Sequence, residues 1–243
     1  MVLGGIFVRK FFILIMVIFV AFFTEVYASE RNISLENSFN NSVFMIFNED
    51  NLGNYTWGTG FFINNQNYAI TNYHVVKDNH NLYIGVMRDK KIYKAKVVKF
   101  DETLDLAMLY VDGINTYNYI SFDSSTNYTG TTYTLGFPQN NDTKLPKYTS
   151  TTGNVIEENV LYKDNYYTRI NNNVCIGNSG GPTLNIDNKC IGIITKGKTN
   201  DTYIIPASKV LEFINNANNT IDLTNKTFAT RTIIPFQLKK FLV

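Results

Sequence analysis

The sequence predicts an all-β protein made of two packed β units, and three observations lead to this class. Of the 243 residues, 44% are hydrophobic and 17% are charged, which is typical of a globular protein with a buried core. From Asn41 onward, short β-branched and aromatic runs are separated roughly every 8 to 15 positions by clusters of Asn, Asp, Gly or Thr, as in sandwiches and barrels. About eleven such runs are too many for one small barrel, so two units fit better.

The first 28 residues have the features of an export signal. Arg9 and Lys10 precede an apolar run at residues 11–23, and Val26-Tyr27-Ala28 supplies a small-residue cleavage site. The run of 13 residues is shorter than the roughly 20 that a membrane-spanning helix needs, so a retained anchor is the weaker alternative. We expect cleavage after Ala28, no stable membrane span after cleavage, and a secreted or periplasmic protein.

The expected strands follow one another from residue 43 to residue 205. The segment 92–98 shows the alternation of a half-buried strand best, because Tyr93, Ala95 and Val97 fall on one face. Lys94 and Lys96 fall on the other face. The expected strands are residues 43–47, 60–63, 68–71, 82–86, 92–98, 106–111, 133–135, 166–170, 182–184, 190–194 and 202–205.

One helix is expected, at residues 207–216. Val210, Leu211 and Ile214 share a helical face directly after Pro206, whereas helical periodicity is nearly absent elsewhere. Residues 217–243 show no clear pattern and are assigned as a tail of unknown role. The expected folded domain is therefore residues 41–216, with its two β units at about 41–117 and 118–206.

Charge and cysteine content exclude several classes of function. The 22 Lys and Arg residues against 20 Asp and Glu residues give a net charge of +2, too weak to favour nucleic acid as a partner. With two cysteines a four-cysteine metal site is impossible, and we expect no metal and no other cofactor. Cys175 and Cys190 could pair in an exported chain, but the sequence leaves this open, and we favour two unpaired, half-buried thiols.

The strongest chemical signal is the loop Gly177-Asn178-Ser179-Gly180-Gly181-Pro182, which has one hydroxyl at its centre. A serine is a useful nucleophile only when a base takes its proton and preorganised donors bind the oxyanion that forms. Gly177 and Gly180 allow backbone conformations that other residues avoid, so the amides of Gly177 and Ser179 could point into one oxyanion hole. The alternative is a glycine-rich turn without chemistry.

Two histidines and one carboxylate are candidates for the rest of a catalytic site. His74 follows the strand 68–71 among apolar residues and is either a base or a structural histidine, whereas His80 lies in a polar loop and is expected at the surface. Asp105 stands at the edge of an apolar strand, where burial is costly unless a donor such as an imidazole N–H binds it. Such a carboxylate would hold the histidine tautomer and stabilise the imidazolium ion.

These motifs together resemble bacterial trypsin-like serine endopeptidases of the HtrA/Deg type over residues 41–216. The chain order His74, Asp105, Ser179 is also that of chymotrypsin. The resemblance implies two six-stranded antiparallel, chymotrypsin-like β-barrels with a triad in the cleft between them. It assigns Ser179 as nucleophile, His74 as general base, Asp105 as orienting carboxylate, and the amides of Gly177 and Ser179 as oxyanion donors. The matching segments are 58–60, 70–76, 105–107, 177–182, 191–193 and 204–206.

The sequence departs from this family at two places. HtrA-type proteases usually carry a PDZ domain of roughly 90 residues, and the 27 residues after Asn216 lead us to expect none in this chain. The resemblance places the substrate pocket at Asn173, Ile194 and Thr195, where an acidic residue at position 173 would select Lys or Arg. Because Asn stands there, we expect a small or medium-sized apolar residue before the cleaved bond. Lys196 and Lys198 could instead attract an acidic side chain, so a preference for an acidic residue stays an alternative.

Three functions fit these residues. The first is an exported endopeptidase acting on protein or peptide substrates, and its oligomeric state is open. The second is a catalytically silent member of the same fold that serves as a binding module or adhesin. The presence of all three triad residues together with the oxyanion loop favours the first function over the second. A viral-type processing protease is disfavoured by the export signal.

Overall fold

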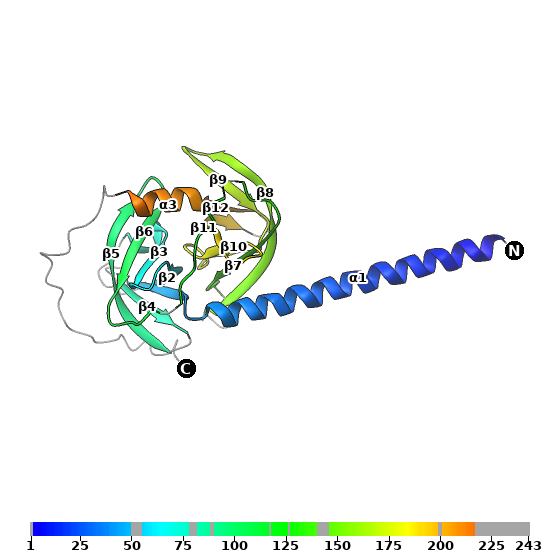
Figure 1. Ribbon diagram of the computed structural model, residues 1–243, viewed down its shortest axis with the longest axis horizontal. Coiled ribbons are helices and arrows are strands. Elements are labelled where there is room, and N and C mark those ends of the chain that lie inside the picture. The colour runs from blue at the N-terminus through cyan, green and yellow to red at the C-terminus, as the bar shows by residue number, and fades with distance from the viewer. Residues whose placement is uncertain are drawn as a thin grey trace, which may run out of the picture.

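The computed structural model describes residues 2–49, 55–77, 82–87, 90–116, 118–125, 127–139, 146–198 and 201–216. The tail expected at residues 217–243 and the surface position expected for His80 lie outside these ranges. The described residues form two closed six-stranded antiparallel barrels and a long helix that projects from them (Figure 1). The predicted all-β class with two six-stranded barrels is confirmed.

The first barrel has the strand order β1-β2-β3-β6-β5-β4. The one-turn helix α2 (Tyr73–Val76) follows β3 directly. Its strands are β1 (Val43–Glu49), β2 (Tyr55–Phe62), β3 (Tyr68–Thr71), β4 (Leu82–Val86), β5 (Lys91–Asp101) and β6 (Leu106–Val111).

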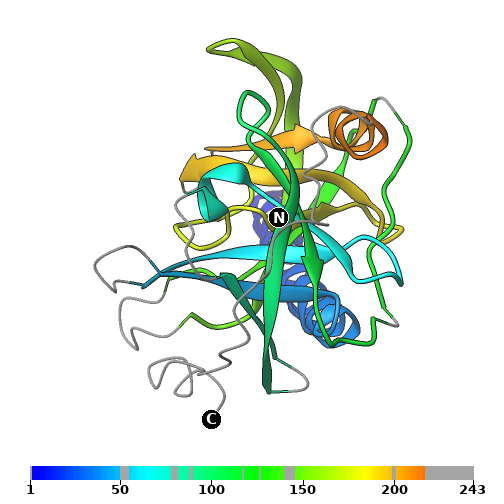
Figure 2. The same cartoon turned by 90° about the vertical axis from the view of Figure 1, so that its left-hand side faces the viewer.

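The second barrel has the order β10-β11-β12-β9-β8-β7 and ends in the helix α3 (Ala207–Asn215). Figure 2 shows the β8–β9 hairpin extending well beyond the rest of this barrel. The helix α3 contacts β11 and β12 as well as β6, so it links the two barrels. The strands are β7 (Thr131–Gly136), β8 (Thr149–Tyr162), β9 (Asn165–Ile170), β10 (Pro182–Leu184), β11 (Cys190–Lys198) and β12 (Asp201–Pro206).

Strand β1 explains how the barrels pack on each other. Phe44 and Ile46 belong to the cluster inside the first barrel. Their neighbours Val43, Met45 and Phe47 belong to a second cluster that also includes residues of β7 and β10. Because alternate side chains of a strand point to opposite faces, both faces of β1 are buried. This double burial accounts for its unbroken apolar sequence and for the rigid contact between the barrels.

The N-terminal helix α1 (Val2–Phe39) continues without a break past the expected cleavage site at Ala28. Residues 10–39 have a mean hydropathy of 2.4 in their most apolar window, and by length and composition they could cross a membrane or act as a signal sequence. The end of the helix is docked on the second barrel. Leu35 is buried, Arg31 donates to Asn188 Oδ1 at 2.6 Å, and Glu36 accepts from the Ser150 amide at 2.6 Å.

The structure corrects two expectations about secondary structure. Helices are more extensive than the single one expected at 207–216, because α1 spans the signal-like segment and α2 carries His74. Strand β8 has no counterpart among the expected strands. Its sequence lacks clear alternation, and much of it is exposed or only partly buried.

Candidate active site

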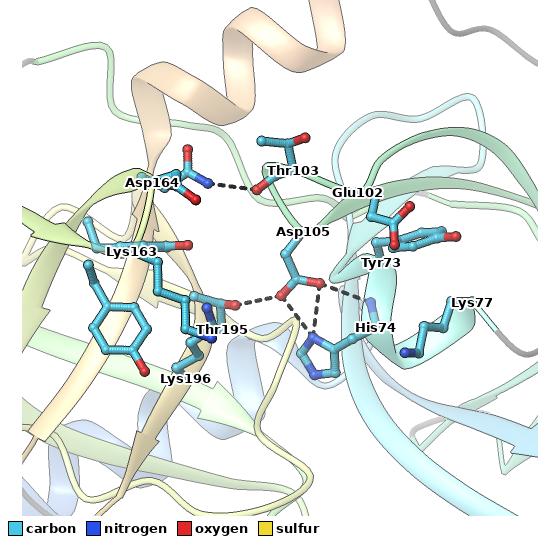
Figure 3. Close-up of a pocket in the computed structure, with 13 residues that line it drawn as sticks. Tyr73, His74, Lys77, Glu102, Thr103, Asp105, Lys163, Asp164, Thr195 and Lys196 are labelled. Atoms are coloured by element: carbon cyan, nitrogen blue, oxygen red, sulfur yellow. Dashed lines mark hydrogen bonds and ion pairs between the residues drawn. The ribbon is translucent and has the colours of Figure 1, made fainter.

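Side chains from both barrels line one pocket that contains His74 and Asp105, and Ser179 is not among its lining residues. Helix α2 supplies His74, and the turn between β5 and β6 supplies Asp105, so both come from the first barrel. Strand β11 of the second barrel supplies Thr195 and Lys196. Figure 3 shows these side chains around a pocket of about 560 Å³.

His74 and Asp105 form a closely held pair. The Nδ1 atom of His74 lies 2.8 Å from Asp105 Oδ2 and 3.0 Å from Oδ1. The backbone amide of His74 also donates to Oδ1, at 2.9 Å. Because a carboxylate only accepts, Nδ1 carries a proton, and in the neutral form of the ring the lone pair lies on Nε2. The imidazole is 43% exposed, so its Nε2 edge can be reached by a ligand.

Asp105 adopts a conformation that few residues other than glycine tolerate. Its φ is +58°, in the left-handed region where Asp and Asn are enriched. With this backbone its carbonyl accepts from the Tyr73 amide at 3.1 Å and from Asn72 Nδ2 at 3.0 Å. The same residue thus anchors the start of α2 through its carbonyl while its carboxylate binds His74.

Thr195 completes the environment of the carboxylate from the opposite barrel. Its hydroxyl donates to Asp105 Oδ2 at 2.6 Å, as the dashed lines of Figure 3 show. Burial raises the pKa of Asp105, but the hydrogen bonds from His74 and Thr195 and the charge of His74 outweigh it, and the pKa lies below its usual 3.8. Asp105 is therefore ionised at neutral pH and can stabilise a positively charged imidazole.

The Ser179 loop is fixed by backbone contacts to both barrels. Thr59 of β2 donates its amide to Ser179 O at 2.9 Å, and Gly180 donates to Ile194 O at 2.8 Å. Gly180 has φ +86°, and a Cβ there would lie 2.1 Å from Thr59 O and 3.1 Å from Asn72 N. Only glycine allows the loop to approach so close to the segment that leads into His74.

The turn that leads into Ser179 presents two unused donors, the amides of Gly177 and Ser179. The amide of Asn178 donates to Cys175 O at 3.1 Å, and Gly177 at the third position of this turn has φ +99°, as in a type II turn. Thr59 Oγ1 donates to Gly177 O at 2.7 Å and holds the turn in place. Within the described part of the chain, the amides of Gly177 and Ser179 donate no hydrogen bond. They are available to an oxyanion.

The structure brings His74 and Asp105 into contact but leaves the Ser179 hydroxyl free. Among the described residues, that hydroxyl forms no hydrogen bond with His74 or with any other group. Apo structures commonly show such long or unformed catalytic hydrogen bonds, which tighten when substrate binds. The two elements nevertheless lie close together, because a Cβ on Gly180 would lie 3.1 Å from the backbone nitrogen of Asn72, two residues before His74.

The three residues assigned to the substrate pocket occupy different environments. Asn173 is exposed, Ile194 is buried in the interior of the second barrel, and Thr195 turns its hydroxyl to Asp105. The role of Thr195 beside the carboxylate, and those of Thr59 and Asn72, were missed by the sequence reasoning. Thr59 and Asn72 lie within the matching segments 58–60 and 70–76, and Thr195 was assigned to the substrate pocket, but nothing in the sequence indicated these hydrogen bonds.

Both cysteines are free thiols, as favoured from the sequence, but neither is half-buried. Cys175 is exposed and Cys190 is fully buried. Burial raises the pKa of Cys190 to about 12 and also raises that of Cys175. Both thiols are thus protonated at neutral pH and are poor nucleophiles. Among the residues that the structure describes, no group of three His, Cys, Asp or Glu side chains could hold a metal ion.

Comparisons with curated proteins identify bacterial relatives. The "Probable periplasmic serine endoprotease DegP-like" of Rhizobium meliloti (strain 1021) is 34% identical over 160 residues, which are 62% of this chain and 31% of that protein. The protein of the same description from Bartonella henselae is 30% identical over 167 residues, or 65% of this chain and 32% of that protein. The chain thus spans about a third of the length of these relatives.

Solved structures share the fold. The active form of the Rv3671c protease from M. tuberculosis superposes with a TM-score of 0.66 at 22% identity, covering 79% of this chain and 86% of that one. The HtrA-type protease AlgW with a tripeptide gives 0.65 at 20% identity, covering 74% and 60%. A family model described as a trypsin-like peptidase domain matches residues 58–193, more than half of the chain. The chain therefore belongs to the trypsin-like peptidase family.

Proposed function

We propose that this protein is an exported serine endopeptidase that cleaves protein or peptide substrates through Ser179, His74 and Asp105. The observation that carries the proposal is the pairing of His74 Nδ1 with an ionised, twice-supported Asp105 beside a loop with two unused amide donors. Membership of the trypsin-like peptidase family and DegP-like relatives support it.

The proposed reaction begins with proton transfer to His74. Nε2 takes the proton of Ser179 as Oγ attacks the substrate carbonyl, and the amides of Gly177 and Ser179 bind the oxyanion that develops. Asp105 stabilises the imidazolium ion. The imidazolium then protonates the leaving amine, which leaves an acyl group on Ser179. A water molecule, deprotonated by His74, attacks this ester, and the imidazolium returns the proton to Ser179 Oγ as the acid product leaves.

Export is the second part of the proposal. The relatives are described as periplasmic, and α1 contains an exposed apolar segment of the composition of a signal sequence. We propose cleavage after Ala28 and a secreted or periplasmic mature chain. N-terminal sequencing of the protein recovered from outside the cytoplasm tests this, with Ser29 expected as the first residue. Recovery of an uncleaved chain in the membrane fraction would contradict it.

The catalytic proposal is tested with casein as substrate. The mature chain is expected to degrade casein, and the Ser179→Ala variant is expected to lose at least about 10³-fold in kcat. A radiolabelled sulfonyl fluoride should label the mature chain at Ser179 and leave the variant unlabelled. If the folded mature chain neither degrades casein nor reacts with the reagent, the alternative of a silent binding module or adhesin replaces the enzyme.

A further inference from the structure

Strand β11 has a free edge next to the candidate triad. On one side it pairs with β12 from Gly192 to Lys198, with a bulge at Thr195. On the other side β10 pairs with it only up to Ile193, and the last bonds on that side join Ile194 to the loop at residues 180–181. Within the described residues, the edge from Thr195 onward pairs with no strand. An extended peptide can add to such an edge through main-chain hydrogen bonds.

The side chain next to this edge is a lysine held on an aromatic surface. Lys196 follows Thr195, whose hydroxyl binds Asp105, so its backbone position is fixed relative to His74. Its ammonium group lies 5.0 Å from the ring centre of Tyr162 and 5.5 Å from that of Tyr167. Lys163 Nζ lies 5.8 Å from the ring centre of Tyr162. Both ammonium groups thus lie within cation–π distance of the Tyr162 ring.

Neither of these cations is neutralised by a carboxylate. Across the described ranges, Lys163 and Lys196 form no ion pair. The carboxylate of Asp105, which also lines the pocket, already binds His74 and Thr195.

The remaining charges of the pocket are separated along its length. In the view of Figure 3, Lys77 and Lys196 lie on either side of the His74 imidazole. Glu102 and Asp164, the other carboxylates of the lining, lie beyond Asp105 at the opposite end. The end of the pocket at the imidazole therefore presents positive charge to a bound peptide.

We propose that Lys196, with Lys163 beside it, forms a subsite for an acidic side chain of the substrate, upstream of the residue whose peptide bond is cleaved. The proposal rests on the endopeptidase function proposed above. Side chains alternate along an extended peptide, so the first and third residues before the bond (P1 and P3) share one face. We place the second and fourth (P2 and P4) on the face toward His74 and Lys196 as part of this proposal. Acidic residues are expected to be preferred at P2 or P4.

The test uses a peptide from a site that the mature chain cleaves in casein. Glu, Gln or Lys is placed in turn at P2, P3 and P4, and kcat/KM is measured for each peptide. At P2 or P4 the wild type is expected to prefer Glu over Gln by roughly fivefold or more, and Gln over Lys. The preference should shrink in 0.5 M salt, because Lys163 and Lys196 are exposed and the screening length between exposed charges falls to roughly a few ångströms at that ionic strength. At P3, the kcat/KM values of the Glu, Gln and Lys peptides should not follow this order.

Charge reversal at one lysine separates this subsite from a general effect of charge. Lys196→Glu is expected to invert the order, so that the Lys peptide becomes the best substrate. Lys91→Glu, the same change at an exposed position at the start of β5 outside the pocket, should leave the order unchanged. If Lys196→Glu does not fold, Lys196→Gln replaces it and is expected to lose the discrimination between Glu and Gln.

Three outcomes would overturn the proposal. Equal cleavage of the Glu and Gln peptides by the wild type at both positions overturns the subsite while the endopeptidase function stands. If both Lys196 variants keep the wild-type preference for Glu, the subsite is likewise overturned and the endopeptidase function stands. If the wild type cleaves no peptide and Ser179 does not react with a sulfonyl fluoride, the proposed function fails and the subsite fails with it.

Discussion

At the scale of single residues, the carboxylate of Asp105 is held by groups from both barrels. His74 donates to it through its ring and its backbone amide, and Thr195 donates through its hydroxyl. Asp105, which orients the imidazole, belongs to the first barrel. The Thr195 hydroxyl, which stabilises the negative charge of Asp105, belongs to the second barrel. The position of the two barrels relative to each other sets the geometry of the proposed base.

Thr195→Val tests this support. The variant keeps the shape of the side chain but removes the 2.6 Å hydrogen bond to Asp105. Because hydrogen bonds to charged groups contribute about 1.5–3 kcal/mol, kcat should fall roughly 10- to 100-fold with little change in KM. Steady-state kinetics on one peptide measures this. Thr195→Ser keeps the hydroxyl and should restore most of the rate, and a Ser variant as slow as the Val variant would contradict the role.

The lowered pKa of Asp105 predicts a dependence of stability on pH. Because the pKa lies below 3.8 in the folded chain, the ionised carboxylate stabilises the fold above the unfolded value. This contribution is lost as the pH falls through the lower, folded value. Urea unfolding of the wild type should therefore show a steeper fall in stability below about pH 4 than that of Asp105→Asn, which keeps the contribution of Asp123, another carboxylate with a lowered pKa. Parallel pH profiles of the two proteins would contradict the assigned hydrogen bonds.

At the scale of secondary structure, patterns that depend on local burial could be predicted and tertiary contacts could not. The segments 43–47 and 106–111 are apolar because they are buried, and both appear as strands. Strand β8 carries polar and apolar residues without order because its hairpin projects beyond the barrel. His74 and Asp105 could be identified from their motifs. Thr195 could not, because its hydrogen bond joins residues 90 positions apart.

Lys99 attaches helix α3, which follows the last strand of the second barrel, to the first barrel. It lies on β5 and is buried, yet its ammonium group donates to the carbonyls of Phe213 and Asn216 at the end of α3. The last carbonyls of a helix have no partner within the helix, and a cation there also interacts favourably with the helix dipole. Lys99 thus caps α3 while joining it to the first barrel.

Lys99→Met is expected to lower the free energy of unfolding by about 1–3 kcal/mol, because two carbonyls would be left without their donor. Urea denaturation followed by circular dichroism measures the change. Lys91→Met, the same substitution at the exposed start of β5, is the control and should change the stability by less than about 0.5 kcal/mol. Equal effects of the two substitutions would show that Lys99 does not cap the helix.

At the scale of the whole molecule, the N-terminal helix has two parts with different surroundings. Its apolar part projects away from the barrels (Figure 1), and none of its most apolar window is buried. Its last three turns contact β8, and Leu35 joins the main hydrophobic cluster. The proposed cleavage after Ala28 would remove the exposed part and leave the docked part, so the segment 29–39 would then belong to the mature fold.

Substitutions of Leu35 and Ile33, two residues of similar size in this segment, distinguish the packing of the helix on the barrel from the stability of the helix itself. Leu35 is 1% exposed and Ile33 is 56% exposed, although they lie two positions apart on the same helix. In the mature chain, Leu35→Ala is expected to lower the free energy of unfolding by about 2–5 kcal/mol, because it leaves a cavity between the helix and the second barrel. Ile33→Ala should change it by less than about 0.5 kcal/mol, since Ala favours a helix and no packing is lost. Chemical denaturation of both variants measures these changes in the free energy of unfolding. Equal, small changes in the two variants would show that residues 29–39 do not pack on the barrel.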